Sequence, residues 1–249
     1  MRGSIIIMLA LIAPLPAAAQ EILPEVERYH SPQRFALELK LGPFIPDIDG
    51  EFSGNSPYED ILGSDPGLMF QTEFDFQVWR GFGSIGVGGS IGYFTKGGAP
   101  FADDSVDGAP ASGNITVAGE TSITLVPLSL LAVYRFDVLA QRYNIPLVPY
   151  IKLGLSYTFW FMDKGDGSIA SYEGDDAEGG SLGWQINLGV ALLLDVFEPQ
   201  SAKTLDMDLG VNHTYIFIEL YHLDANGFSG ETALNVGDTS FLAGLAIEF

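Results

Sequence analysis

The sequence of 249 residues has no cysteine, only 11 lysines and arginines, and no long uninterrupted apolar run. Without cysteine, a disulfide scaffold and a lipoprotein anchor are both excluded. Eleven scattered bases cannot neutralise a phosphate backbone, so nucleic acid is excluded as a partner. The longest apolar candidate, residues 186–197, is interrupted by Asn187 and Asp195 and is too short for a transmembrane helix.

Acidic and apolar residues are abundant instead. The chain carries 32 acids, a formal charge of −21 and 47% hydrophobic residues. Disordered acidic chains are poor in apolar residues, so this composition indicates a folded protein.

The N-terminal residues have the layout of an export signal. Arg2 precedes nine apolar residues at 5–13, Pro14 and Pro16 follow, and three alanines stand at 17–19. Nine helical residues reach about 14 Å, whereas the hydrocarbon core of a bilayer is about 30 Å thick. We therefore expect a signal peptide at 1–19 rather than a membrane anchor, followed by an N-terminal periplasmic segment at 20–32 and one domain at 33–249.

Eight segments alternate between apolar and polar residues with a period of two. In the second segment Phe70, Phe74 and Phe76 share one face, opposite Glu73 and Asp75. This alternation is typical of strands with one apolar face, and the lengths suit a membrane-spanning sheet. The eight segments are 35–41, 70–78, 84–93, 123–136, 151–161, 184–194, 215–221 and 241–249.

The connections alternate between long and short. Those at 43–66, 96–120, 163–180 and 224–237 are long and together hold 18 acids but only Lys96 and Lys164 as bases. The intervening ones are mostly shorter, and that at 197–212 is expected to hold a helical turn around 202–207. Long loops on one side and shorter turns on the other predict an all-β fold, an eight-stranded antiparallel up-and-down transmembrane β-barrel.

In such a barrel the apolar faces contact lipid and the polar faces fill a lumen too narrow for an aqueous pore. Buried charges are costly unless they are paired, so we expect a structural network of mixed sign rather than a catalytic group. The inward charged residues are Glu38, Lys40, Glu73, Asp75, Arg135, Lys152, Glu219 and Glu248.

Aromatic residues lie near the strand ends and are interpreted as two girdles at the membrane interfaces. Phe249 also resembles the terminal aromatic that barrel-assembly machinery recognises. The periplasmic girdle comprises Trp79, Phe82, Tyr134, Phe136, Tyr150 and Phe249, and the outer girdle comprises Tyr93, Phe94, Phe159, Trp160, Phe161, Trp184 and Tyr221.

Candidate catalytic residues are few. The three histidines are His30, His213 and His222, and no Gly-x-Ser-x-Gly motif occurs. His213 and the His222–Asp224 pair are expected at opposite ends of one strand, too far apart to cooperate. The sequence therefore predicts no enzyme and no catalytic site.

Residues 163–173 partly match a calcium-binding loop. With Gly167 at loop position 6, Glu173 occupies position 12, but Met162 and Lys164 stand where ligands are needed. We therefore predict no dedicated metal site and no cofactor. The acidic loops are instead expected to attract divalent cations weakly, through charge density.

Four stretches resemble an outer-membrane β-barrel family of myxobacteria and their relatives: LVPLSLLAVYRF at 125–136, YNIPLVPYIKL at 143–153, GVNHTY at 210–215 and VGDTSF at 236–241. The resemblance spans about 33–249. It implies the barrel fold and a place in the outer membrane, and it implies no activity, ligand or catalytic residue.

The favoured function is a non-enzymatic outer-membrane barrel with long acidic outer loops and a structural, adhesive or binding role. Its expected partners are membrane lipids, lipopolysaccharide and the assembly machinery. One alternative is a soluble exported barrel that binds a lipophilic ligand inside, with its apolar face inward. The other is a membrane-embedded enzyme that modifies lipids.

Overall fold

The computed structural model describes residues 34–98, 121–164, 167–172, 175–227 and 234–249. The predicted signal peptide and the segment 20–32 lie outside these residues. None of the helices in the described ranges has the length and apolar character needed to cross a membrane.

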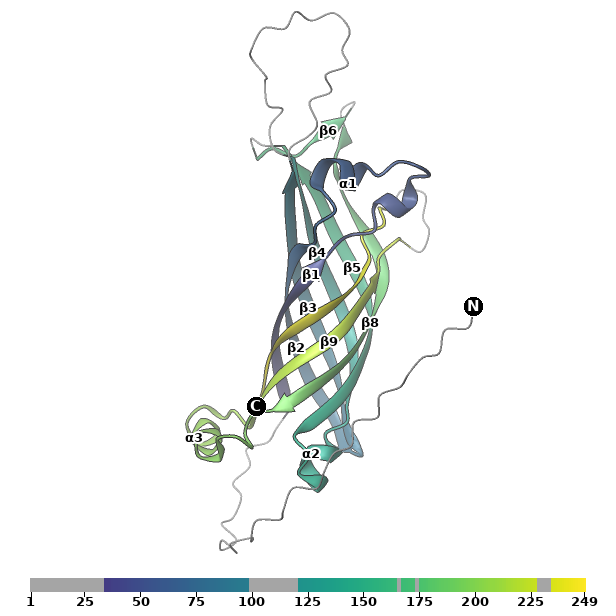
Figure 1. Cartoon of the computed structure of the whole chain (residues 1–249). Coiled ribbons are helices and arrows are strands. Elements are labelled where there is room, and N and C mark those ends of the chain that lie inside the picture. Colours follow the sequence, from purple (N-terminus) through teal and green to yellow (C-terminus); the bar gives the residue numbers. More distant parts are fainter. Residues whose placement is uncertain (1–33, 99–120, 165–166, 173–174, 228–233) are drawn as a thin grey trace, which may run out of the picture.

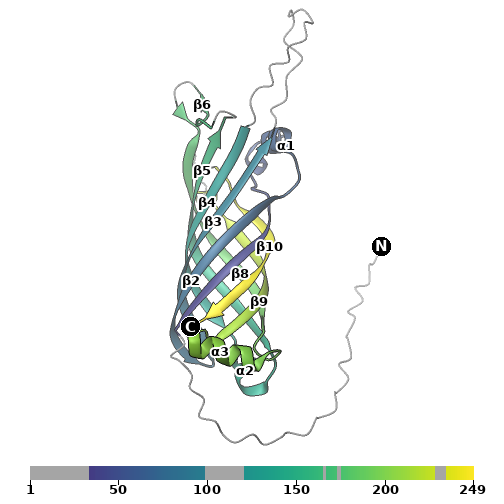
Figure 2. The same cartoon turned by 90° about the vertical axis from the view of Figure 1, so that its left-hand side faces the viewer.

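Eight long strands close into one antiparallel barrel (Figures 1 and 2). Seven contacts join strands that follow one another along the chain, and pairing of the first strand with the last completes the ring. The predicted up-and-down barrel is confirmed. Its strands are β1 Phe35–Phe44, β2 Gly67–Gly81, β3 Gly83–Gly98, β4 Thr121–Arg135, β5 Leu147–Asp163, β8 Glu178–Leu193, β9 His213–Asp224 and β10 Asp238–Glu248.

The two ends of the barrel differ. One end, called the loop end, carries the short helices η1 Asp49–Glu51 and α1 Pro57–Leu62 and the small hairpin of β6 Ser171–Tyr172 and β7 Asp175–Asp176. The other, called the turn end, carries α2 Val138–Tyr143, α3 Pro199–Leu209 and the end of β10 (Figure 1). The helical turn expected at 202–207 is confirmed within the longer α3, whereas α1, α2 and the hairpin were not predicted.

Several strands extend past their predicted limits. β5 runs from Leu147 to Asp163 and β8 starts at Glu178, although alternation indicated 151–161 and 184–194. Backbone pairing continues at both ends, for example between Phe161 and Glu178. Strand length follows this hydrogen bonding, which does not require apolar side chains.

The outer wall of the barrel is apolar. Leu155 is 61% exposed, whereas the next residue, Ser156, is 1% exposed and faces the lumen. The predicted facing of the strands is confirmed. The exposed apolar side chains of the wall include Leu39, Leu41, Phe70, Phe74, Phe76, Val87, Ile91, Leu128, Leu130, Leu153, Leu155, Tyr157, Leu182, Leu188, Ile216, Ile218, Phe241 and Leu245.

The lumen is filled in layers. Towards the loop end an apolar cluster closes it, and there Phe44 packs against Phe94 with ring centroids 5.2 Å apart. Towards the turn end a charged network occupies the interior. The apolar cluster comprises Phe44, Ile48, Tyr58, Met69, Phe94, Ile123, Leu125, Tyr221, Leu223, Ala225, Val236 and Leu242.

The predicted aromatic girdles need correction at four positions. Tyr150, Phe94 and Tyr221 are buried in the lumen, and Trp160 packs against the apolar cluster there, whereas Tyr93, next to Phe94, faces outward. The reason is the period of two, because adjacent residues of a strand point to opposite sides of the sheet. Nearness to a strand end sets the height of a side chain but not its side.

Two adjacent residues of β3 provide a test of this facing. Phe94→Ala removes a fully buried ring from the apolar cluster and should lower the free energy of unfolding by about 3–5 kcal/mol. Tyr93→Ala removes a ring that is half exposed on the outer wall and should lower it less. Urea unfolding of the detergent-solubilised variants measures both, and equal losses would contradict the observed facing.

Candidate functional site

Seven charged side chains in the lumen form an unbroken chain of alternating sign. Arg135 bonds Asp75 and also Glu38, the latter at 2.6 Å. Glu38 is bonded in turn by the ammonium of Lys152, which lies 2.6 Å from Glu73 Oε1. Lys40 Nζ continues the chain, because it lies 2.7 Å from Glu73 Oε2 and 2.8 Å from Glu219 Oε1.

This series of ion pairs crosses the barrel and does not simply follow neighbouring strands. Its members come from β1, β2, β4, β5 and β9, and Glu38 on β1 meets Lys152 on β5. Neutral groups bond its last carboxylate, since Tyr150 Oη donates to Glu219 Oε2 at 3.0 Å and Asn187 Nδ2 to Oε1 at 2.7 Å. The predicted network of mixed sign is confirmed.

Three of these carboxylates could present ligand atoms to a metal ion. Oxygens of Glu38, Glu73 and Asp75 lie within 4.8 Å of one another. However, Lys152 already bonds both glutamates and Arg135 already bonds Glu38 and Asp75. Protein cations therefore occupy the place that a metal ion would take, and the cluster is best explained as a structural network.

The histidine candidates are separated as expected. In the β9–β10 register His213 pairs with Glu248 at the turn end, and His222 pairs with Thr239 at the loop end. His222 Nδ1 lies 2.7 Å from Thr239 Oγ1, while Asp224 accepts a hydrogen bond from the Trp184 indole. The imidazole and carboxylate of the His222–Asp224 pair thus have other partners, and His30 lies outside the described residues.

His213 has a partner that the sequence did not indicate. Its Nδ1 lies 2.6 Å from Asp195 Oδ2, and the other oxygen of Asp195 accepts a bond from Thr214 N at 3.1 Å. Asp195 was noted only as an interruption of an apolar run. The pair ties the end of β8 to the start of β9 and has a structural explanation.

The calcium-loop candidate is described only in part. Asp163 forms an isolated bridge with Ile169, and Lys164 N donates to Ser168 O at 2.8 Å. These contacts pair the described residues on the two sides of this segment. Asp166 and Glu173 lie outside the described residues, so the prediction about this loop stays a prediction.

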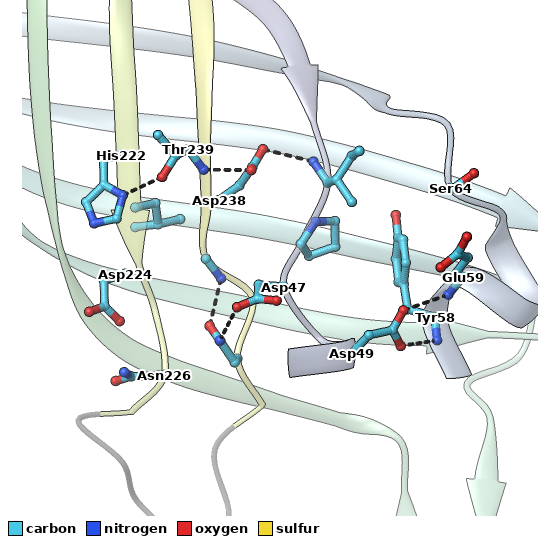
Figure 3. Close-up of a pocket in the computed structure, with 15 residues that line it drawn as sticks. Asp47, Asp49, Tyr58, Glu59, Ser64, His222, Asp224, Asn226, Asp238 and Thr239 are labelled. Atoms are coloured by element: carbon cyan, nitrogen blue, oxygen red, sulfur yellow. Dashed lines mark hydrogen bonds between the residues drawn. The ribbon is translucent and has the colours of Figure 1, made fainter. Parts of the chain in front are cut away.

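A cavity of about 690 Å³ opens at the loop end of the barrel and forms the candidate site (Figure 3). Its lining includes Ile45, Pro46 and Leu223, together with Tyr58 from α1. Sequence reasoning missed this site, because its residues come from the end of β1, from α1 and from both sides of the β9–β10 connection. Five acids line it: Asp47, Asp49, Glu59, Asp224 and Asp238.

Backbone amides hold several of these carboxylates in place. Asp49 accepts bonds from Tyr58 N at 2.7 Å and Glu59 N at 3.0 Å, so it caps the start of α1 (Figure 3). Asp238 Oδ2 accepts from Ile45 N at 2.9 Å, which ties β10 to the end of β1. Asp49 and Asp238 therefore have structural roles, and the five acids together make the cavity strongly negative.

Tyr58 adds a neutral polar group to this acidic surrounding. Its side chain is buried, and its hydroxyl has no hydrogen-bond partner within the described part of the chain. Burial, together with the carboxylates of Asp49 and Asp238, raises the pKa of the hydroxyl to about 12. The group is therefore protonated at neutral pH, and the negative charge of the cavity comes from its carboxylates.

Comparisons with known proteins do not indicate a function. No protein-family model and no curated protein matches the sequence. Among solved structures, the chain is similar to Ail, the attachment invasion locus protein of Yersinia pestis, with a TM-score of 0.42 and 10% identity over 87% of this chain and 97% of Ail. A likeness this weak carries no functional argument, and the fold stated above rests on the strand pairing itself.

The charged chain in the lumen predicts a large effect for one cation. Lys152→Met leaves Glu38 and Glu73 short of a buried partner and should lower the free energy of unfolding by about 3–5 kcal/mol. Urea unfolding in detergent measures this loss. Adding Glu73→Gln should recover part of it, because one buried negative charge is removed.

Lys203→Met is the matched control, since Lys203 is exposed on α3 and its loss should change stability by less than about 0.5 kcal/mol. Equal stability of the Lys152 and Lys203 variants would contradict the view that the network supports the barrel.

Proposed function

We propose that this protein is a non-enzymatic β-barrel of the outer membrane of a Gram-negative envelope, with a structural, adhesive or binding role at its acidic loop end. The observation that carries the proposal is the inverted polarity of the barrel. Apolar side chains cover the outer wall while the ion pairs are buried inside. A wall of this kind is suited to hydrocarbon, where every backbone group must be paired within the sheet.

The interior argues for a sealed barrel rather than a channel. The apolar cluster fills the lumen towards the loop end, and the alternating ion pairs fill the part towards the turn end. An eight-stranded barrel is narrow enough for side chains to fill. This packing supports a function at the surface of the barrel over the passage of solutes through it.

The two alternatives are less well supported. A soluble carrier of lipophilic ligands needs a polar wall and an open apolar lumen, whereas the observed wall is apolar and the lumen is filled by ion pairs and by the packed apolar cluster. A lipid-modifying enzyme needs a nucleophile or base poised at the wall, whereas His213 and His222 lie at opposite ends and are bonded to Asp195 and Thr239.

Fractionation tests the proposal directly. The protein is expected in the outer-membrane fraction, where an unboiled sample should migrate faster in electrophoresis than a boiled one because the closed barrel stays folded. Recovery of the mature chain as a freely soluble periplasmic protein would overturn the proposal.

The lipid-facing wall predicts a depth-dependent cost for charge. Leu155→Arg places a cation on the wall and should cost about 2–4 kcal/mol if Leu155 lies near the midplane of the bilayer. Unfolding in phospholipid vesicles measures this cost. The control Leu155→Met keeps the position apolar and should stay close to the parent, and an Arg variant as stable as the Met variant would contradict a lipid contact at this position.

The acidic loop end predicts weak binding of divalent cations. Five acids line its cavity, and further acids lie in the long connections. Such a field concentrates counterions and is screened over about 8 Å at physiological salt. Calorimetric titration of the refolded protein with calcium should therefore show weak binding that salt suppresses.

The pair Asp47→Asn and Glu59→Gln should reduce this calcium binding only partly, because other acids remain. A single tight site that salt does not weaken, and that Glu173→Gln abolishes, would instead support a dedicated calcium loop at 163–173.

A further inference from the structure

Helix α3 is unusual because none of its eleven residues is buried. Its ends are well formed, since Pro199 begins it and Gly210, with φ 71°, ends it with a bond from its N–H to Asp206 O. A helix shorter than about 12–15 residues is marginal in water without tertiary packing. Among the described residues α3 contributes no buried side chain, so tertiary packing within them stabilises it little.

One face of α3 carries both of its leucines and its alanine, whereas its methionine lies on the other side. At 100° per residue, Ala202, Leu205 and Leu209 fall within roughly 60° of one another. Both leucines expose apolar side chains, Leu205 to 36% and Leu209 to 71%. Lys203 and Met207 lie on the roughly opposite side. We call the first three residues the α3 stripe.

The position of α3 indicates what covers the stripe. The helix lies at the foot of the barrel and beyond its wall, at the level where the strands end (Figure 1). Phe197, just before it, is 67% exposed, and the outward Trp79 and Phe82 mark the same end of the barrel. The α3 stripe therefore lies at the same end of the barrel as these exposed apolar side chains of the wall.

We propose that α3 is an interfacial helix whose stripe lies in the periplasmic leaflet of the membrane, at the boundary between headgroups and acyl chains. The inference rests on the proposed function, because it requires the barrel wall to stand in a bilayer. A short helix with one apolar face and one polar face suits this plane. With one lysine against two aspartates, α3 is held by apolar contact and not by attraction to anionic lipid.

Because the chain has no cysteine, single-cysteine variants test this directly. Leu209→Cys reports the stripe, Met207→Cys the opposite face and Leu155→Cys the barrel wall. All three positions are exposed, and heat-modifiable migration checks that each variant folds. Each is labelled with a nitroxide in phosphatidylethanolamine–phosphatidylglycerol vesicles, and collisions with oxygen, which enters the bilayer, are compared with collisions with a water-soluble nickel chelate.

The expected result is a higher ratio of oxygen to nickel collisions at 209 than at 207. A cysteine scan over 199–209 should oscillate with a period of about 3.6 residues. High nickel access at both 207 and 209, with 155 in lipid, would overturn the role of α3 alone. Spin–spin broadening at 209 would also overturn it, since it would indicate a second copy against the stripe. High nickel access at 155 would instead overturn the proposed membrane location.

Discussion

Closure of β1 on β10 is the constraint on which the rest of this structure depends. Leu39 opposes Leu245 in that pairing, and the amide of Phe35 bonds the carbonyl of Phe249, so the first and last strands leave no open edge. A sheet with an apolar outer wall can exist in hydrocarbon only when its backbone groups are all paired. Closure also creates the single interior into which every polar face must point.

That interior explains how the chain accommodates charge inside an apolar wall. Each cation of the buried charge network, Arg135, Lys152 and Lys40, contacts at least two carboxylates, so none of the three is left without a counter-charge. Removing water from these groups is costly, and only good geometry offsets that cost. Most of these ion pairs link strands that are not neighbours, and they therefore fix the shape of the lumen as well as its charge.

The two ends of the barrel perform different physical tasks. At the loop end, Asp49 and Asp238 use their carboxylates to fasten α1 and the end of β1, and the same oxygens make the cavity negative. At the turn end, outside the barrel wall, the apolar side chains of Phe197 and Leu209 are exposed. In the proposed membrane, this difference between the two ends would give the barrel a defined orientation.

The sequence by itself determined the number of strands, their facing and the membership of the charged lumen, because the period-two pattern is a local property of an extended backbone. It indicated α3 only as a turn. It wrongly placed Tyr150, Phe94, Trp160 and Tyr221 in girdles, since nearness to a strand end does not fix the side of the sheet. The pairing of each ion, the Asp195–His213 contact and the acidic cavity were decided only by the tertiary structure. Asp47 and Asp238 are far apart in the chain, and the closure of β1 on β10 alone brings them together.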